Sequence, residues 1–457
     1  MKNTNLKKAV CAAVAGMMLA LTACGEVKES PAENNGSSKT TTTTAETVLT
    51  PDEPAPDEST PDDEDVTGGS SKTVVAEPDT KPDDEFYEAY NNYAAELFIK
   101  TCDDDLRDGK NAMISPESVM MALGMTANGA KGDTLTQMEE TLGGTPIDKL
   151  NTAMQYRMAR FNNAEDVSFN VANSVWVRDD AERIKMSEDF CGKARDFYGA
   201  ESFLAPFDRS TVADINNWVN EQTKQMIPSI IDQIPDDAMV YLINAIAFEG
   251  KWAEGYKDYQ IQADDKFTNS KGEEERVDML YSEEGYYIAE DGVTGFIKPY
   301  MGYEYGFMAL LPEEGTDLAD FTASLDGEKL RKFTSDAGGD VNVCIPEFTF
   351  DYDNELSEEL QAMGMVLPFE GGDFSGMADC GDGNLEINRV LHKTHIELDR
   401  EGTKAAAATA VEMTCEAAIE IEEPKYVYLN RPFAFAIVDL ENGSPIFIGG
   451  VNTIKNS

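Results

Sequence analysis

The first stretch of the chain with the pattern of a packed element starts at residue 86. Phe86, Tyr90, Tyr93, Leu97 and, approximately, Ile99 fall near one stripe of a helix. This spacing predicts an amphipathic helix that buries one face. The preceding residues show no comparable periodicity.

Two further helices are predicted next along the chain. Ser115 is suited to cap the first of them, because its hydroxyl can accept a backbone N–H, and Pro116 fits the first helical position. Gly129 is expected to end this helix. The second has apolar residues at helical spacing up to Leu142, and Gly143-Gly144 should end it.

Strands dominate the rest of the chain. Five of the six alternate positions from 167 to 177 are apolar, which predicts a long strand with one buried side: Val167, Phe169, Val171, Val175 and Val177. A helix over 213–227 precedes an unbroken apolar run at 238–252, which is typical of a strand buried on both faces. More strands are predicted at 305–317, 340–353 and 431–453, the last turning at Asn442-Gly443. Helices followed by strands indicate an α+β fold.

Residues 392–423 combine two patterns. Thr394, Ile396 and Leu398 alternate like a strand, but Gly402 and the run "TKAAAATA" follow directly. An alanine run is also typical of a helix interior, so periodicity alone leaves both assignments open.

The N-terminal residues have the features of an export signal. Lys2, Lys7 and Lys8 precede an apolar run, residues 9–21, that is too short for a membrane helix. The run closes on "LTAC", which resembles the bacterial lipoprotein processing box. We therefore expect a lipoprotein signal peptide at 1–23 and a lipidated Cys24; a plain secretory signal is the alternative. The expected location is the outer side of a bacterial membrane, with the lipid as the only membrane contact.

Residues 24–85 are expected to form a disordered acidic tether after Cys24, because they are rich in Ser, Thr, Pro, Asp and Glu and offer little to bury. The formal net charge of the whole chain is −49. Such a charge repels nucleic acids and anionic membranes, so neither is an expected partner.

The sequence offers no constellation typical of an enzyme. Its two histidines, His392 and His395, are three residues apart on one predicted strand and so point to opposite faces. We find no nucleophile elbow, phosphate-binding loop or dinucleotide motif. The cysteines after the signal are widely spaced, without a metal-binding pattern: Cys102, Cys191, Cys344, Cys380 and Cys415. We expect no metal and no cofactor.

Seven blocks resemble landmarks of the serpin family and occur in the family's order. They are 111–143, "ANSVWV", "INNWVNEQT", "LINAIAFEGKW", "VCIPEF", "HKTHIELDREGT" and "NRPFAFAI". The resemblance implies one domain, 86–457, with three β-sheets, eight or nine helices and an exposed reactive loop at about 402–425. It also implies a protease inhibitor, not an enzyme. A protease that cuts the loop becomes acylated on it, and the freed arm enters the main sheet as a new strand.

This mechanism accounts for the alanine run. A strand that enters a packed sheet places alternate side chains in the core, where only small ones fit. By the resemblance, the inward residues of the hinge are Thr403, Ala405, Ala407 and Thr409, and Gly402 is the joint. The family often has an acidic residue where this chain has Lys404, but that side chain would face outward.

Five residues match family positions at the opening of the main sheet. Ser115, Ser118, Asn244 and His392 match a buried polar cluster beneath the sheet, and Trp252 matches an aromatic residue at its top. We expect Asn244 and His392 to hydrogen-bond across the gap where strands part.

Counting from the hinge places the cleaved bond near Glu416-Ala417, between the neighbours Cys415 and Ala418. A cut after Glu416 implies a protease that prefers acidic residues. A cut after Ala417 or Ala418 implies an elastase-like serine protease, which we favour because small residues follow one another there.

The expected protein is therefore a monomeric inhibitory serpin whose partner is an elastase-like serine protease. Two alternatives remain open. A non-inhibitory serpin would act as a binding or substrate protein, and a cross-class inhibitor would trap cysteine proteases or respond to thiols through Cys415.

Overall fold

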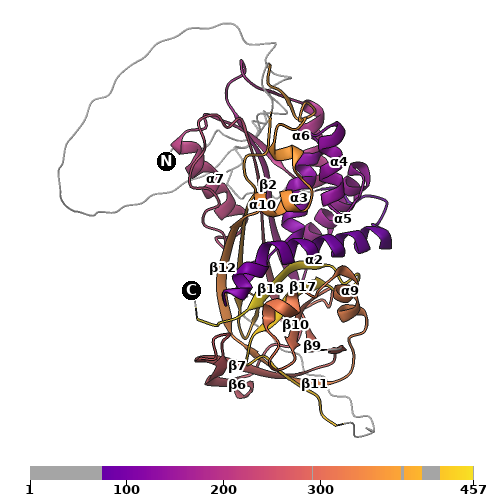
Figure 1. The fold of residues 1–457 in the computed structure, drawn as a ribbon, viewed down its shortest axis with the longest axis vertical. Coiled ribbons are helices and arrows are strands. Elements are labelled where there is room, and N and C mark those ends of the chain that lie inside the picture. The colour runs from indigo at the N-terminus through magenta and orange to yellow at the C-terminus, as the bar shows by residue number, and fades with distance from the viewer. Residues whose placement is uncertain (1–74, 291, 382–384, 404–422, 456–457) are drawn as a thin grey trace, which may run out of the picture.

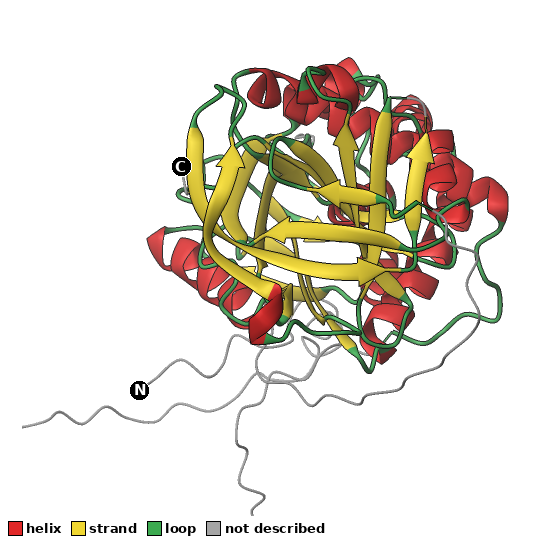
Figure 2. Cartoon of the chain, turned by 90° about the horizontal axis from the view of Figure 1, so that it is seen from below, coloured by secondary structure: helices red, strands yellow, loops and turns green. Residues whose placement is uncertain are grey.

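The computed structural model describes residues 75–290, 292–381, 385–403 and 423–455. Within them, nine α-helices surround three large β-sheets and a two-stranded pair, which confirms the α+β class (Figures 1 and 2). In this described part, no helix is long and apolar enough to cross a membrane.

The long helices are assembled mostly from the first half of the chain. They are α2 (Asp84–Arg107), α3 (Pro116–Ala127), α4 (Gly132–Thr141), α5 (Ile147–Asn163), α6 (Glu188–Tyr198) and α7 (Arg209–Gln222). Shorter helical segments are α8 (Leu318–Thr322), α9 (Gly327–Ser335), α10 (Ser357–Ala362), η1 (Asp258–Gln260) and η2 (Leu367–Phe369).

A six-stranded sheet, here called the main sheet, runs in the order β12-β14-β15-β5-β2-β4. Its strands are β2 (Val167–Arg178), β4 (Glu201–Ala205), β5 (Val240–Lys251), β12 (Phe348–Glu355), β14 (Leu391–Leu398) and β15 (Gly402–Thr403). One face packs on the core, while Ile215 and Val219 of α7 pack on the other against Trp176 of β2. Both faces of the main sheet are covered, and this explains why the sequence of β5 is an unbroken apolar run.

The second six-stranded sheet, the central sheet, is antiparallel and deeply buried, with every residue of β10, β17 and β18 inaccessible. Its order is β1-β18-β17-β10-β9-β8. The strands are β1 (Ala112–Ile114), β8 (Tyr287–Glu290), β9 (Val293–Pro299), β10 (Tyr305–Pro312), β17 (Phe433–Asp439) and β18 (Pro445–Val451).

A four-stranded sheet lies at the end of the molecule opposite α4 and α6 (Figure 1). Its order is β16-β11-β7-β6, with β16 parallel to β11. The strands are β6 (Ile261–Thr268), β7 (Glu274–Glu284), β11 (Val341–Pro346) and β16 (Tyr426–Tyr428). The separate pair joins β3 (Lys185–Met186) to β13 (Ala378–Asp379).

Local signals placed several elements correctly. Ser115 caps α3, accepting the Ser118 N–H at 3.2 Å. α3 already ends at Ala127, before Gly129. Glycine is needed at 129 for packing, because a Cβ there would lie 2.5 Å from the Met377 side chain.

Two predicted core positions need correction. Ile99 and Val171 are only partly buried, whereas their neighbours Phe98 and Asn170 are fully buried. Phe98 shows that the buried face of α2 is wider than one stripe. Because β2 is covered on both faces, alternation along it does not separate inside from outside.

A buried ion pair joins α3 to α5. The Arg157 Nε lies 2.7 Å from both carboxylate oxygens of Glu117, and both side chains are almost fully buried. Burying one charge without the other is strongly unfavourable, so the pair constrains how the two helices pack.

We predict that Glu117→Ala lowers the free energy of unfolding by about 3–5 kcal/mol, because it leaves the Arg157 guanidinium buried without its partner. Urea unfolding measures this. The double variant Glu117→Leu/Arg157→Met should recover most of the loss. Glu274→Ala, in the exposed pair with Lys266, should have little effect. Equal instability of the single and double variants would contradict the prediction.

Candidate functional site

Within the part of the chain that the structure describes, strand pairing joins the two halves of the main sheet at one end only, through β15. There β15 pairs with β5 through Gly402–Lys251 and Thr403–Gly250, and with β14 through Thr403–Leu398. Among the described residues, no strand pairing joins β5 to β14 beyond these positions. The facing edges of β5 and β14 therefore define an opening in the middle of the sheet.

The chain enters this opening through a tight turn. The Asp399 carboxylate accepts the backbone N–H groups of Glu401 at 2.7 Å and Gly402 at 3.1 Å. Gly402 has a φ of 155°, and a Cβ there would lie 2.1 Å from the Gly250 carbonyl oxygen. Only glycine permits so close an approach to β5.

Aromatic side chains fix the start of β15. The Trp252 ring stacks on Tyr300 with centroids 4.9 Å apart, and its Nε1 donates to the Asp399 carbonyl at 3.0 Å. The Tyr300 and Thr403 hydroxyls are hydrogen-bonded at 2.7 Å. The buried Thr403 is thus held by Tyr300, which directly follows β9 of the central sheet, and Trp252 braces the turn before it.

Four polar residues meet further along the opening, at the start of α3. The Ser115 N–H donates to His392 Nε2 at 3.0 Å, and the Ser118 hydroxyl donates to the Asn244 side-chain oxygen. The expected hydrogen bond between Asn244 and His392 is not formed. Each side chain instead bonds to α3, because the helix start lies directly beneath the two strands and offers a donor to each.

The buried His392 is held in its neutral form. Burial lowers its pKa from 6.5 to about 4. Nε2 accepts a hydrogen bond from Ser115, so a proton on this nitrogen would break that contact. His395 lies on the opposite face, where its Nδ1 is 2.7 Å from Asp351. The two histidines thus form no joint site.

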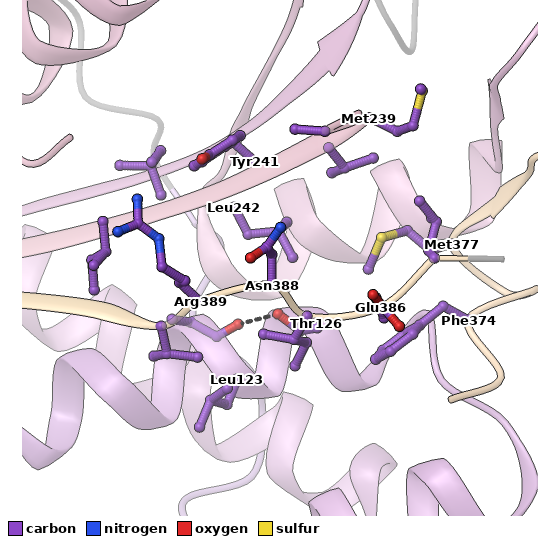
Figure 3. Close-up of a pocket in the computed structure, with 18 of the residues that line it drawn as sticks. Leu123, Thr126, Met239, Tyr241, Leu242, Phe374, Met377, Glu386, Asn388 and Arg389 are labelled. Carbon is purple, nitrogen blue, oxygen red and sulfur yellow. Dashed lines mark hydrogen bonds between the residues drawn. The ribbon is translucent and has the colours of Figure 1, made fainter. Parts of the chain in front are cut away.

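A cavity of about 870 Å³ lies between β5, β14 and α3, below the polar cluster. Its wall combines apolar side chains, such as Leu123, Leu242 and Phe374, with polar ones, and Arg389 stands at one side (Figure 3). Met239, Met377 and Glu386 gather toward one end. Ser118, Asn244 and His392 also line it, so the cavity and the polar cluster form one site.

Other predicted positions lie outside the described residues. These are the hinge residues Ala405, Ala407 and Thr409, the residues around the expected cut, Cys415, Glu416, Ala417 and Ala418, and the expected lipid anchor Cys24.

Several residues of this site were not predicted from the sequence. Asn173 of β2 accepts from the Asn244 amide at 2.5 Å and donates to the Tyr198 carbonyl at 2.6 Å, which extends the polar cluster across the sheet. Its signal was a polar residue inside the apolar run of β2. Tyr300 and Asp399 carried no signal, because their partners are distant in sequence or are backbone atoms.

The main sheet is thus open at its centre, with β15 at one end of the opening and the cavity at the other. The family model described as "Serpin (serine protease inhibitor)" matches residues 88–454. The chain belongs to the serpin family.

Relatives of this serpin come from distant organisms. The leukocyte elastase inhibitor of Xenopus tropicalis is 30% identical over 79% of this chain and 97% of its own. A serpin-like protein of Methanosarcina acetivorans is 29% identical over 82% and 89%. The crystal structure of the thermophilic serpin tengpin in its native state has a TM-score of 0.75 and 39% identity over 83% of this chain and 96% of tengpin.

The site of this serpin is suited to mechanical work. The Nε2 of His392 faces a backbone N–H and not a nucleophile, and its proton affinity is too low for a general base near neutral pH. The contacts beneath the opening are hydrogen bonds from the start of α3 to His392 and Asn244. The family is described as one of serine protease inhibitors.

We predict that His392 makes stability fall below pH 6.5. The unfolded chain takes up a proton near pH 6.5 that the folded chain refuses until about pH 4, so this group costs about 2 kcal/mol at pH 5. Urea unfolding at pH 7 and pH 5 should show this loss in the parent and its absence in His392→Gln. His395→Gln, on the opposite face, should keep it. Equal pH dependence in parent and His392→Gln would refute the assignment.

Proposed function

We propose that this protein is an inhibitory serpin that traps a serine protease, of the elastase-like class, as a covalent acyl-enzyme after its reactive loop is cut and inserted. One observation carries the proposal. Gly402 and Thr403 already occupy the position of a new strand between β5 and β14, and the opening continues below them. Strand addition by a serpin loop is itself a known case of sheet extension.

The register of β15 predicts the cross-strand neighbours of each later residue if the strand continues. Thr409 is six residues beyond Thr403, and six residues back from Gly250 and Leu398 are Asn244 and His392. Thr409 would therefore enter between the two strand residues of the polar cluster. Its hydroxyl can donate one hydrogen bond and accept others, so a buried polar environment is available to it.

The same register fits the cavity. Continuing inward at every second residue, Val411, Met413 and Cys415 would lie opposite pairs of residues that all line it: Leu242 and Val390, Val240 and Asn388, and Ala238 and Glu386. Three largely apolar side chains would thus meet apolar residues in and just before β5 on one side, and Val390, Asn388 and Glu386 on the other. The residues up to the proposed cut at Glu416-Ala417 are enough to fill the opening.

Insertion supplies the driving force for the trap. About ten new strand hydrogen bonds at roughly 0.5–1.5 kcal/mol each, together with three apolar side chains at about 1.5–3 kcal/mol each, give about 10–24 kcal/mol. That is comparable with the whole stability of a protein domain. It is enough to distort a protease that remains attached by an ester bond.

The hinge composition supports inhibition over a substrate role. The inward residues Thr403, Ala405, Ala407 and Thr409 are all small. A large or charged residue at any of them would be forced into the core and would slow insertion, which lets the protease hydrolyse the ester and leave.

We predict that the parent protein forms a complex with pancreatic elastase that survives denaturing gel electrophoresis, and that Ala407→Glu abolishes it while the loop is still cut. A buried glutamate opposes insertion. Ala406→Glu is the matched control, since its side chain faces outward and should preserve the complex.

Mass spectrometry of the released C-terminal peptide locates the bond, with a start at Ala417, Ala418 or Ile419 expected. A cut outside Thr414 to Ile419 would contradict the proposed register. Loop cleavage by elastase without any complex from the parent would favour the non-inhibitory alternative, and a complex that depends on reductant would favour a role for Cys415.

The proposed location is the outer side of a bacterial membrane, with Cys24 lipidated and residues 25–85 as a tether. "LTAC" after an apolar run supports this. Expressed in a bacterium, the parent should incorporate labelled palmitate and Cys24→Ser should not. Release of unlabelled parent into the medium would indicate a plain secretory signal instead.

A further inference from the structure

The turn that follows β5, residues 252–256, holds the backbone just before β15 at three successive carbonyl groups. Trp252 donates its Nε1 to the Asp399 carbonyl at 3.0 Å and its backbone N–H to the Glu401 carbonyl at 3.1 Å. The Tyr256 N–H donates to the carbonyl of the residue between them at 3.4 Å. We call residues 252–256 the supporting turn.

β15 needs such support because it is only two residues long. It pairs with β5 through Gly402 and Thr403, and with β14 through Thr403 alone. Strands in proteins are usually 3–10 residues long, and pairing at so few positions is marginal by itself. The position of β15 therefore depends on what holds the backbone before it.

The side chain of Lys298, in β9, lies against both rings of the supporting turn. Its Nζ is 4.6 Å from the centroid of the Tyr256 ring and 5.5 Å from that of a ring of Trp252. An ammonium group within about 6 Å of a ring centroid is attracted by the negative face of the ring. One cation thus contacts both aromatic residues whose N–H groups hold the backbone before β15.

Lys298 is itself fixed by a carboxylate. It is the only lysine that is buried among the described residues, and its Nζ lies 2.6 Å from an oxygen of Glu284, at the end of β7, which is also buried. The Ser282 hydroxyl donates to the same oxygen at 2.6 Å and lies 3.3 Å from the Tyr256 hydroxyl. The ammonium group is therefore held between the four-stranded sheet and the supporting turn.

Stability alone does not account for this ion pair. Replacing a buried ion pair by uncharged residues of similar volume is often neutral or stabilising, because both charges lose their hydration on burial. An uncharged side chain at position 298 would still fill the space, but it would not attract the faces of the two rings. What the lysine adds is a fixed position for the supporting turn.

We propose that Lys298 is a positioning residue for strand insertion: it holds the supporting turn, and the supporting turn holds β15 between β5 and β14. The inference rests on the proposed function for the insertion step. The backbone of β15 is already ordered, so the freed arm extends a strand that has begun and does not bear the entropy cost of its first pairs. A looser β15 would slow insertion and give water time to hydrolyse the ester, which releases the protease.

The first test compares the full chain with its variant Lys298→Met/Glu284→Gln, which removes both charges at similar volume and keeps an acceptor for Ser282. The readout is hydrogen exchange of backbone amides, followed by mass spectrometry. We expect exchange in 252–256 and 401–403 to become at least tenfold faster. Exchange in α2 and the urea midpoint should stay close to those of the parent, because no charge is left buried without a partner.

A matched control removes a second ion pair from the same four-stranded sheet. Lys266 and Glu274 lie 2.8 Å apart across β6 and β7, and both side chains are more than half exposed. Lys266→Met/Glu274→Gln should leave exchange in the supporting turn unchanged, since an exposed pair contributes little and contacts neither ring.

The second test measures insertion with pancreatic elastase. In Lys298→Met/Glu284→Gln the second-order rate constant of loop cleavage should equal that of the parent, because the loop sequence is unchanged. The number of inhibitor molecules cut for each elastase trapped should rise at least threefold. The control variant should change neither quantity.

The outcomes separate the two proposals. Unchanged exchange in 252–256 and 401–403 overturns the positioning role of Lys298. Faster exchange throughout the molecule with a lower urea midpoint also overturns it, because the pair would then serve only the stability of the whole domain. Faster local exchange with an unchanged number cut for each elastase trapped contradicts the role in insertion. Faster local exchange in a protein whose parent forms no denaturant-resistant complex supports the hold on β15 and contradicts the trap.

Discussion

Two strand edges that face each other without pairing are the constraint on which this structure depends. In the described residues, β5 and β14 are bridged by strand hydrogen bonds only at Gly402 and Thr403. Backbone groups in a buried sheet need partners, so an open seam is a stored source of free energy. In the proposed mechanism, the surrounding elements hold this seam open until the cut loop enters it as a strand.

The polar cluster under the seam serves this purpose because its bonds are exchangeable. The start of α3 donates to the His392 side chain through Ser115 and to the Asn244 side chain through Ser118. One helix end therefore bonds to a side chain on each of the two strands. Apolar side chains in place of the polar cluster would pack the two strands firmly together. The rigid support comes from elsewhere, notably the buried pair of Glu117 and Arg157, which fixes α3 against α5.

Topology turns the seam into a one-way device. The loop begins at Thr403 in the main sheet and ends at Tyr426 in the four-stranded sheet, so an intact loop is tied at both ends. In the proposed mechanism, cutting it frees only the arm that continues β15. The other end stays paired to β11 through β16.

By itself, the sequence determined the features that depend on neighbours along the chain. The cap at Ser115, the strand periods, the Asn442-Gly443 turn and the ordered serpin blocks were enough for the fold class and the family. The hydrogen-bond partners of the buried polar side chains depended on contacts between residues that are distant in sequence. Thus Asn244 and His392 bond to α3 and not to each other, and Tyr300, absent from every motif, holds Thr403. Packing decides these contacts, because a buried polar group takes whichever partner the tertiary fold brings nearest.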